Sequence, residues 1–256
     1  MNRLINPSVI ITARLKSLRL PLKVIRLVDG QCPVIEYLIN RLLQARIPKH
    51  IILATSTNPQ DDLLVDYALK TGIKYFRGDE KDVLTRIHQA ALSVKANYIV
   101  SLTADTPLVD FRYIDKVFHF FQTNKADFVT TTDLPLGTFV YGLKVRAIKR
   151  ALDIKQNLDT EVWGGYFKPE FGFTRIPYPI PHQLIDPKIR LSIDYPEDLQ
   201  LVKQVIKLLS PKNPYFTTNH IIKLFQCSPH LYTINQHCQQ LYEKHLQKAP
   251  KAAICT

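Results

Sequence analysis

Short apolar stretches alternate along the first half of the chain with longer segments whose apolar residues recur every three or four positions. The apolar stretches are SVIITA, HIILATS, IKYF and NYIVSLTAD, at residues 8–13, 50–56, 73–76 and 97–105. Runs as apolar as these predict strands buried on both faces, as in a parallel sheet. The segments with helical spacing are residues 33–46, 61–72 and 82–94. The alternation predicts an α/β fold with a Rossmann-like, mostly parallel sheet and helices on both faces.

The second half of the chain predicts additions to this sheet. Residues 126–145 hold two β-rich stretches around a Pro/Gly break, which favours extra or antiparallel strands. The run KIRLSID at residues 188–194 predicts a late strand. The helix that follows is expected to begin at Pro196, because proline suits the first helical turn and two acidic residues come directly after it.

The remaining segment is rich in Pro, Asn and His and has two modest helical patterns. We therefore divide the chain into a main α/β domain at residues 1–210 and a C-terminal helical extension at residues 211–256. The last residues, 249–256, are expected to fray, as chain ends commonly do.

The net charge of the chain indicates which kind of partner the protein binds. The chain has 34 Lys and Arg against 22 Asp and Glu, a net charge of +12, which favours anionic partners. The basic residues are scattered without a run of five or six, so we expect no nucleic-acid partner. The first apolar run is too short, and too soon interrupted by charge, for a signal peptide or a membrane span. We expect no membrane association and a cytoplasmic location.

Cysteine and histidine spacing gives no sign of a metal or disulfide framework. The cysteines, Cys32, Cys227, Cys238 and Cys255, form no CxxC pair, so neither a disulfide framework nor a zinc site is predicted. The eight histidines show no ligand spacing, and none is given a catalytic role. The chain also lacks a GxSxG element, which leaves a hydrolase with a covalent intermediate without support.

A basic loop follows the first predicted strand. Its sequence, ARLKSLRLPLK, places Arg14, Lys16, Arg19 and Lys23 within ten residues at the carboxyl end of that strand. Ligands bind at this end of open α/β sheets, and four cations there would neutralise a polyphosphate. The alternative is a solvated basic loop without a ligand.

Two aspartates stand at the carboxyl ends of predicted strands. Asp105 ends the strand predicted at residues 97–105, and Asp194 ends the late run at residues 188–194. If these strands are neighbours, the two carboxylates meet in one crevice and suit Mg²⁺ that carries substrate phosphates. The alternative makes each aspartate a turn or helix-cap residue before its proline.

The basic loop, with the pattern ARxxSxRLPxK, resembles the nucleotide-binding loop of cytidylyltransferases that activate acidic sugars. These include the acylneuraminate and 3-deoxy-manno-octulosonate enzymes, and the spore-coat polysaccharide type is the nearest in appearance. The resemblance implies a fold of the nucleotide-diphospho-sugar transferase type, with residues 1–210 as the nucleotidyltransferase domain. It implies that Arg14 and Lys23 contact the triphosphate of CTP, with Ser17 and Arg19 in support.

A second stretch, FRGDEKDVLTR at residues 76–86, is similar to the family segment FRGxxxDVLxR. Arg77 and Gly78 end a short predicted strand and Asp82 opens a helix, so these three residues are further nucleotide-binding candidates. The alternative for Asp82 is a helix-terminal residue alone. The family also has glycine where this chain has Lys16 and Leu22.

The resemblance also names the metal ligands. Asp105 matches the acid of the family motif GDxPL and Asp194 that of TxDxPED, which implies that both hold Mg²⁺. Ala104 replaces the glycine of the first motif. The catalytic residues implied by the resemblance are Arg14, Lys23 and Asp105.

The acceptor side follows the family less closely. In LPLGTFVYGLKV, Gly137 keeps the family pattern, whereas Phe139 and Tyr141 stand where relatives have acidic residues. Glu161 and Trp163 are candidates for sugar contact, because a carboxylate and an indole face suit sugar hydroxyl and CH groups. Gly137 and Tyr141 complete the acceptor-binding candidates. A single tryptophan is also common in a core or an interface.

The resemblance implies an enzyme that transfers CMP from CTP to a sugar, of the acidic 2-keto class, and releases pyrophosphate in surface-glycan precursor synthesis. Two alternatives remain open. One is a nucleotidyltransferase of other base or acceptor specificity, such as a sugar or alcohol phosphate. The other is a catalytically degraded homologue that serves as a binding or scaffold subunit. Family members often dimerise, so a homodimer is a further open question.

Overall fold

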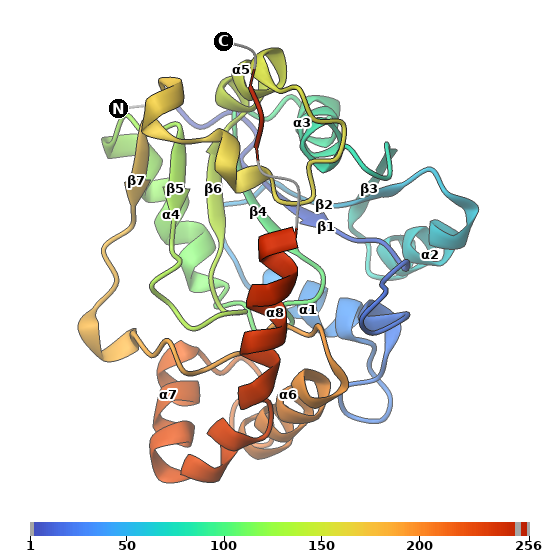
Figure 1. The fold of residues 1–256 in the computed structure, drawn as a ribbon, viewed down its shortest axis with the longest axis vertical. Helices are drawn as coiled ribbons and strands as arrows, with labels where there is room; N and C mark the ends of the chain where they lie inside the picture. Colours follow the sequence, from blue (N-terminus) through green and yellow to red (C-terminus); the bar gives the residue numbers. More distant parts are fainter. Residues whose placement is uncertain (1–2, 249–251, 255–256) are drawn as a thin grey trace.

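The computed structural model describes residues 3–248 and 252–254. Within them, seven strands form one sheet in the order β3-β2-β1-β4-β6-β5-β7 (Figure 1). The strands are β1 (Ser8–Thr12), β2 (His50–Ser56), β3 (Lys74–Gly78), β4 (Tyr98–Thr103), β5 (Phe128–Thr130), β6 (Tyr141–Lys144) and β7 (Arg175–Pro177). Of these, β6 alone runs against its neighbours, which confirms the mostly parallel sheet.

Helices cover both faces of the sheet (Figure 1). They are α1 (Val34–Leu42), α2 (Asp62–Lys70), α3 (Val83–Ser93), α4 (Arg112–Thr123), α5 (Val145–Ile154), α6 (Pro196–Leu209), α7 (Thr218–Cys227) and α8 (Gln236–Lys248). Short 3-10 turns lie at Lys23–Ile25, Pro59–Asp61, Trp163–Tyr166, Pro169–Phe171, His182–Leu184 and Pro229–Thr233. Helices α3 and α5 share one core with the side of β1 that carries Ile10, whereas Val9 and Ile11 face the core of α1, α2, α4, α6 and α7. The strand alternates because successive side chains point to opposite faces.

The predicted strands and helices of the first half correspond to β1 through β4 and to α1, α2 and α3. The β-rich stretches of residues 126–145 are confirmed as β5 and β6, and the predicted start of α6 at Pro196 is also confirmed. Helices α4 and α5 and strand β7 were not predicted from the sequence. Helix α4 is strongly amphipathic, and β7 is a three-residue edge strand too short to leave a clear pattern.

The late strand predicted at residues 188–194 is wrong as a strand of the sheet. Arg190 forms one isolated bridge with Leu136, and the Leu191 N–H donates to the Leu136 carbonyl at 2.7 Å. The Ile193 N–H donates to the carbonyl of Asp105 at 2.9 Å. The alternating apolar side chains are buried as expected, but the backbone partners of this segment are loops. It therefore lies along the loop after β4 and carries Asp194 to the same edge of the sheet.

The C-terminal extension returns to the main body of the chain. Helix α7 packs against α6, and α8 runs from beside these helices toward the middle of the molecule (Figure 1). Beyond α8, Ile254 forms a bridge with Lys155, and the Gln156 N–H donates to the Ala253 carbonyl at 2.9 Å. Fraying was therefore the wrong prediction for residues 252–254, and the other tail positions lie outside the described residues. None of the described helices is long and apolar enough to cross a membrane.

The basic loop after β1 contains a leucine in a left-handed backbone conformation. Leu22 has φ 57° and ψ 23°, and its side chain is 48% exposed. An L-residue in this region brings its Cβ close to a carbonyl oxygen, a clash that glycine avoids. The resemblance places a family glycine at this position, so the turn keeps the glycine-type backbone with a different residue.

Changing Leu22 to Gly is expected to raise the free energy of unfolding by about 0.5–1 kcal/mol, because relief of the left-handed strain exceeds the entropy that glycine adds to the unfolded chain. Denaturant unfolding measures the change. Leu18→Gly is the control: Leu18 is 94% exposed in the same loop and has no positive φ, so this change should lower stability. A loss of stability in Leu22→Gly equal to that of the control would contradict the account.

Candidate active site

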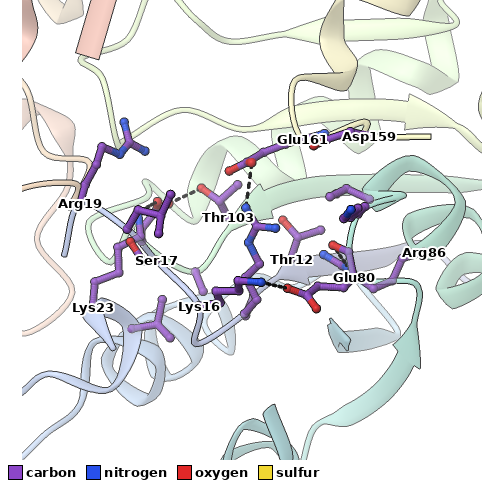
Figure 2. Close-up of a pocket in the computed structure, with 18 of the residues that line it drawn as sticks. Thr12, Lys16, Ser17, Arg19, Lys23, Glu80, Arg86, Thr103, Asp159 and Glu161 are labelled. Carbon is purple, nitrogen blue, oxygen red and sulfur yellow. Dashed lines mark hydrogen bonds and ion pairs between the residues drawn. The ribbon is translucent and has the colours of Figure 1, made fainter. Parts of the chain in front are cut away.

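A pocket of about 360 Å³ lies at the carboxyl ends of β1 and β4 (Figure 2). Its wall comes from the loop after β1, the turn before α3, the end of β4, the segment at residues 159–163 and His245 of α8. The carboxyl edge of a mostly parallel sheet is where α/β folds bind ligands. The basic loop and Asp105, just after β4, therefore share this cavity, whereas Asp194 does not line it and meets Asp105 through Lys23.

Buried contacts fix the path of the basic loop. Leu15 and Leu20 are in the core, and the Leu15 N–H donates to Asp61 Oδ1 at 2.7 Å. Asp61 is fully buried and also accepts a hydrogen bond from the Ser56 hydroxyl at the end of β2. The Ser17 hydroxyl accepts from the Leu20 N–H at 3.4 Å. Arg14, Lys16, Ser17 and Arg19, which lie between or beside these buried leucines, consequently line the pocket.

One ammonium group joins the two strand-end aspartates. Lys23 Nζ bonds to Asp105 Oδ2 and also donates to Asp194 Oδ1 at 2.9 Å. Arg19 donates to the same Asp194 oxygen at 2.7 Å, and Arg190 donates to the other oxygen at 2.7 Å. The structure therefore brings together Arg19, Lys23, Asp105 and Asp194, which the sequence had placed in one site.

A third carboxylate completes the network behind Asp194. Asp198, fully buried in the first turn of α6, accepts from Arg190 Nε at 3.0 Å and from the Asp194 N–H at 2.9 Å. Asp105, Asp194 and Asp198 are thus balanced by Lys23, Arg19 and Arg190. Three anions and three cations give a neutral cluster, which is the condition for burying so many charges.

The cluster also sets the protonation of its members. Burial lowers the pKa of Lys23, but Asp105 and Asp194 outweigh burial and keep this pKa above its ordinary value. Burial raises the pKa of Asp194, yet Lys23 and Arg19 hold it below its ordinary value. Both groups are therefore charged at neutral pH.

The donor set at this position fits a divalent cation. Asp105 and Asp194 offer carboxylate oxygens to a shared cationic centre, which in this structure is the Lys23 ammonium. Mg²⁺ prefers hard oxygen ligands and commonly takes only one or two carboxylates from the protein, with substrate phosphates beside them. The pair can hold such an ion when Lys23 turns toward a phosphate.

Two further ion pairs cross the pocket. Arg14 bonds to Glu161 Oε2 at 2.7 Å, and Lys16 Nζ lies 3.5 Å from Glu80 Oε1 (Figure 2). Both carboxylates are partly open to solvent, so water weakens these pairs. A polyphosphate entering the pocket can take over both cations.

Three of the predicted nucleotide-binding residues lie outside the pocket lining. Arg77 donates to the carbonyls of Ser56 and Asn58, both at 2.9 Å. The Asp82 carboxylate caps α3 by accepting a hydrogen bond from the Thr85 N–H at 3.1 Å. Asp82 therefore has the helix-terminal role that the sequence offered as an alternative to nucleotide binding. Gly78, the third of these residues, packs against Arg86: a Cβ added at Gly78 would lie 3.1 Å from a side-chain carbon of Arg86.

Arg86, by contrast, does line the pocket, and it is buried. Its guanidinium donates to the carbonyls of Asp79 and Glu80. The segment at residues 76–86 therefore shapes the pocket wall chiefly because Arg86 fixes the backbone at Asp79 and Glu80.

Some of the predicted acceptor-binding residues line the pocket and others lie outside it. Glu161 and Trp163 line the pocket, whereas Gly137 and Tyr141 do not. Gly137 has φ +93°, and a Cβ there would be 2.4 Å from the Leu191 carbonyl carbon, so this glycine permits close backbone packing. Burial raises the pKa of Tyr141 to about 12.

Trp163 has a core role as well as a pocket surface. It is 8% exposed, and its ring centroid lies 5.5 Å from that of Tyr141 and 5.9 Å from that of Phe128. The aromatic cluster fixes the indole, and the small exposed part faces the pocket.

Sequence reasoning missed several residues of the site. Asp159 and His245 line the pocket, and Tyr242 of α8 lies 4.6 Å from the Arg190 guanidinium. Arg190 and Asp194 are four residues apart in an extended segment, so their side chains are expected on the same side. This spacing could have identified Arg190 as a partner of Asp194. No local signal marks His245, because only tertiary packing brings α8 to the pocket.

The chain is similar to known proteins along most of its length. The cytidylyltransferase family model matches residues 8–222. An uncharacterised protein of Methanocaldococcus jannaschii is 30% identical over 90% of this chain and 95% of its own length. The spore coat polysaccharide biosynthesis protein SpsF of Bacillus subtilis is 28% identical over 86% of this chain and 94% of its own.

A solved cytidylyltransferase of Leptospira borgpetersenii superposes with a TM-score of 0.82 at 24% identity, covering 89% of this chain and 97% of that one. This likeness shows that the fold is shared along nearly the whole chain. The match of the family model over residues 8–222 establishes that the chain belongs to the cytidylyltransferase family of CTP-dependent nucleotidyltransferases.

Proposed function

We propose that the protein transfers CMP from CTP to a hydroxyl group of an acidic 2-keto sugar and releases pyrophosphate. The observation that carries the proposal is the contact of Lys23 Nζ with both Asp105 and Asp194. It puts a cation position at the carboxyl edge of the sheet, inside a pocket with room for a nucleotide.

The charge of the pocket supports anionic substrates. Its lining has six basic residues and four acidic ones: Arg14, Lys16, Arg19, Lys23, Lys81 and Arg86 against Glu80, Asp105, Asp159 and Glu161. In this proposal Arg14, Arg19 and Lys23 bind the triphosphate, and the Ser17 hydroxyl supports the loop. An excess of positive charge also suits an acceptor that carries a carboxylate.

The reaction is a substitution at the α-phosphorus. The acceptor oxygen bonds to this phosphorus as the bond to the bridging oxygen of the β-phosphate breaks, and the hydroxyl proton leaves to solvent or a base. Arg14 and Lys23 stabilise the charge that collects on the leaving pyrophosphate. Asp105 and Asp194 would hold Mg²⁺, which when bound neutralises charge on the phosphate oxygens.

The Arg14–Glu161 ion pair couples the two substrates. Arg14 is held by Glu161 at 2.7 Å in the free protein. When Arg14 turns to the triphosphate, Glu161 becomes available to accept hydrogen bonds from acceptor hydroxyls beside Trp163. CTP is therefore expected to bind before the acceptor.

The relationship to SpsF, whose name refers to spore coat polysaccharide biosynthesis, supports a role in making surface-glycan precursors. We place this reaction in the cytoplasm, since the free thiols of Cys32 and Cys227 suit a reducing compartment.

A pyrophosphate-release assay with Mg²⁺ tests the proposal. Four nucleoside triphosphates are combined with two acceptor classes, 2-keto sugar acids and sugar phosphates. Turnover is expected with CTP at least about tenfold above the other nucleotides, because one lost base contact is worth that factor or more. It is expected with the acids and absent with the sugar phosphates.

Each other outcome selects an alternative. Preference for UTP, GTP or ATP would reject the cytidylyl assignment for this chain, and turnover with sugar phosphates alone would reject the acidic acceptor. CTP binding with no turnover for any acceptor would favour a scaffold role.

Asp82 gives a separate prediction, because its contacts support α3 and not the pocket lining. It bonds to Lys155 and accepts from the Thr160 hydroxyl at 3.0 Å. Asp82→Ala is expected to lower the free energy of unfolding by about 2 kcal/mol through the lost cap and the unpaired lysine. The Michaelis constant for CTP should stay within about threefold.

The control is Asp153→Ala, which removes a carboxylate from an exposed pair with Lys149 and should change stability by less than about 0.5 kcal/mol. A tenfold rise in the Michaelis constant of Asp82→Ala with unchanged stability would show that Asp82 binds the nucleotide directly.

A further inference from the structure

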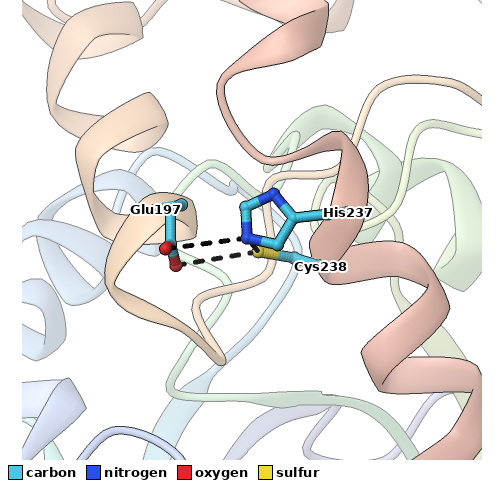
Figure 3. Close-up of side chains that lie close together, drawn as sticks. All are labelled: Glu197, His237 and Cys238. Carbon is cyan, nitrogen blue, oxygen red and sulfur yellow. Dashed lines mark hydrogen bonds and ion pairs between the residues drawn. The ribbon is translucent and has the colours of Figure 1, made fainter.

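Three side chains with metal-binding atoms meet where α6 and α8 begin. Glu197 comes from the first turn of α6, and His237 and Cys238 come from the first turn of α8 (Figure 3). His237 Nε2 lies 3.6 Å from Glu197 Oε1 and 3.6 Å from Cys238 Sγ. Cys238 Sγ lies 3.8 Å from Glu197 Oε2. Across residues 3–248 and 252–254, no other three such side chains converge in this way.

These separations match the spacing of ligands around one zinc ion. Zinc lies about 2.3 Å from sulfur and about 2.0–2.2 Å from nitrogen or oxygen in tetrahedral sites. Two ligands of such a site are therefore about 3.3–3.6 Å apart. Two of the observed separations, at 3.6 Å, lie at the upper end of this range, and the third, at 3.8 Å, exceeds it by about 0.2 Å, which a small side-chain rotation removes.

The two helix starts are fixed together independently of any ion. Asn235, just before α8, is buried and donates to Asp198 Oδ1 at 2.7 Å and to the Arg190 carbonyl at 3.0 Å. Asp198 in turn accepts from the backbone N–H of Tyr195 at 3.0 Å. The ligands therefore stand on a rigid support, which is what a metal site of useful affinity requires.

We propose that Glu197, His237 and Cys238 bind a Zn²⁺ ion. Cys238 is fully buried and His237 is exposed, so water can occupy the fourth position on the solvent side. The thiol proton leaves to solvent as the sulfur–zinc bond forms. A thiolate and an imidazole select zinc, whereas the oxygen pair of Asp105 and Asp194 suits magnesium. Sequence spacing alone gave no zinc pattern, because Glu197 lies forty residues before its partners.

The ion would link α8 to α6 beside the active site. One helical turn beyond Cys238, Tyr242 lies 4.6 Å from the Arg190 guanidinium and 5.8 Å from that of Arg19. His245, further along α8, lines the pocket. Zinc at the start of α8 would thus reinforce the docking of the helix whose His245 lines the nucleotide pocket.

Cobalt substitution in the full-length protein tests the site. Co²⁺ bound through a thiolate absorbs strongly in the near ultraviolet, whereas Co²⁺ on oxygen ligands alone does not, so binding at the aspartate pair is not mistaken for it. One equivalent of Co²⁺ should give the thiolate band, and Zn²⁺ should abolish it. His237→Gln and Cys238→Ser should each weaken Co²⁺ binding by about 100-fold or more.

Cys227→Ser is the matched control, since Cys227 is an exposed free cysteine on α7 and should leave the band unchanged. His237 is exposed, so His237→Gln keeps the test valid even if Cys238→Ser perturbs the core. Absence of the band in the unmodified protein, or its survival in both ligand variants, would overturn the proposal.

Discussion

The contact of one lysine with two aspartates is the constraint on which the rest of this site depends. Asp194 is buried, Lys23 and Asp105 are mostly shielded from solvent, and neither carboxylate could remain charged there without cations beside it. The pairing requires β1 and β4 to be neighbours, and it requires the segment before α6 to reach the same edge of the sheet. Removing one member of a buried charge cluster costs about 3–5 kcal/mol, because its partners are left unpaired.

The same arrangement explains how a folded, neutral cluster can become an active site. In the proposed reaction Asp105 and Asp194 would hold a divalent ion, and the Lys23 ammonium, released from their oxygens, would turn toward the nearest negative charge. In the proposed reaction that charge is the triphosphate. Arg14, paired with Glu161 in the open pocket, makes the same exchange. In the proposed reaction, the resting ion pairs would therefore keep the cations near the phosphate positions and reduce the reorganisation needed during catalysis.

The sequence predicted the parts of the molecule that rest on local pattern. Buried runs gave β1 through β4, and the family resemblance placed Lys23 and Asp194 in one site. The sequence did not predict that Arg77 binds backbone carbonyls outside the pocket, because a motif shows the type of a residue but not the direction of its side chain. It could not predict Tyr242 or His245, since the docking of α8 depends on tertiary contacts such as that of Asn235. The extended run ending at Asp194 was mistaken for a strand because its apolar and polar residues alternate, although no neighbouring strand in the described part of the chain pairs with it.

The most direct test of the central contact is the turnover number for pyrophosphate release from CTP in Lys23→Met and Lys16→Met. Both lysines lie on the same loop and line the same pocket, but only Lys23 joins the two aspartates. The account predicts that Lys23→Met lowers the turnover number by about 10²–10³-fold, the usual effect of losing one preorganised transition-state donor. Lys16→Met should lower it by less than about tenfold. Equal losses in the two variants, or full activity in Lys23→Met, would contradict the account.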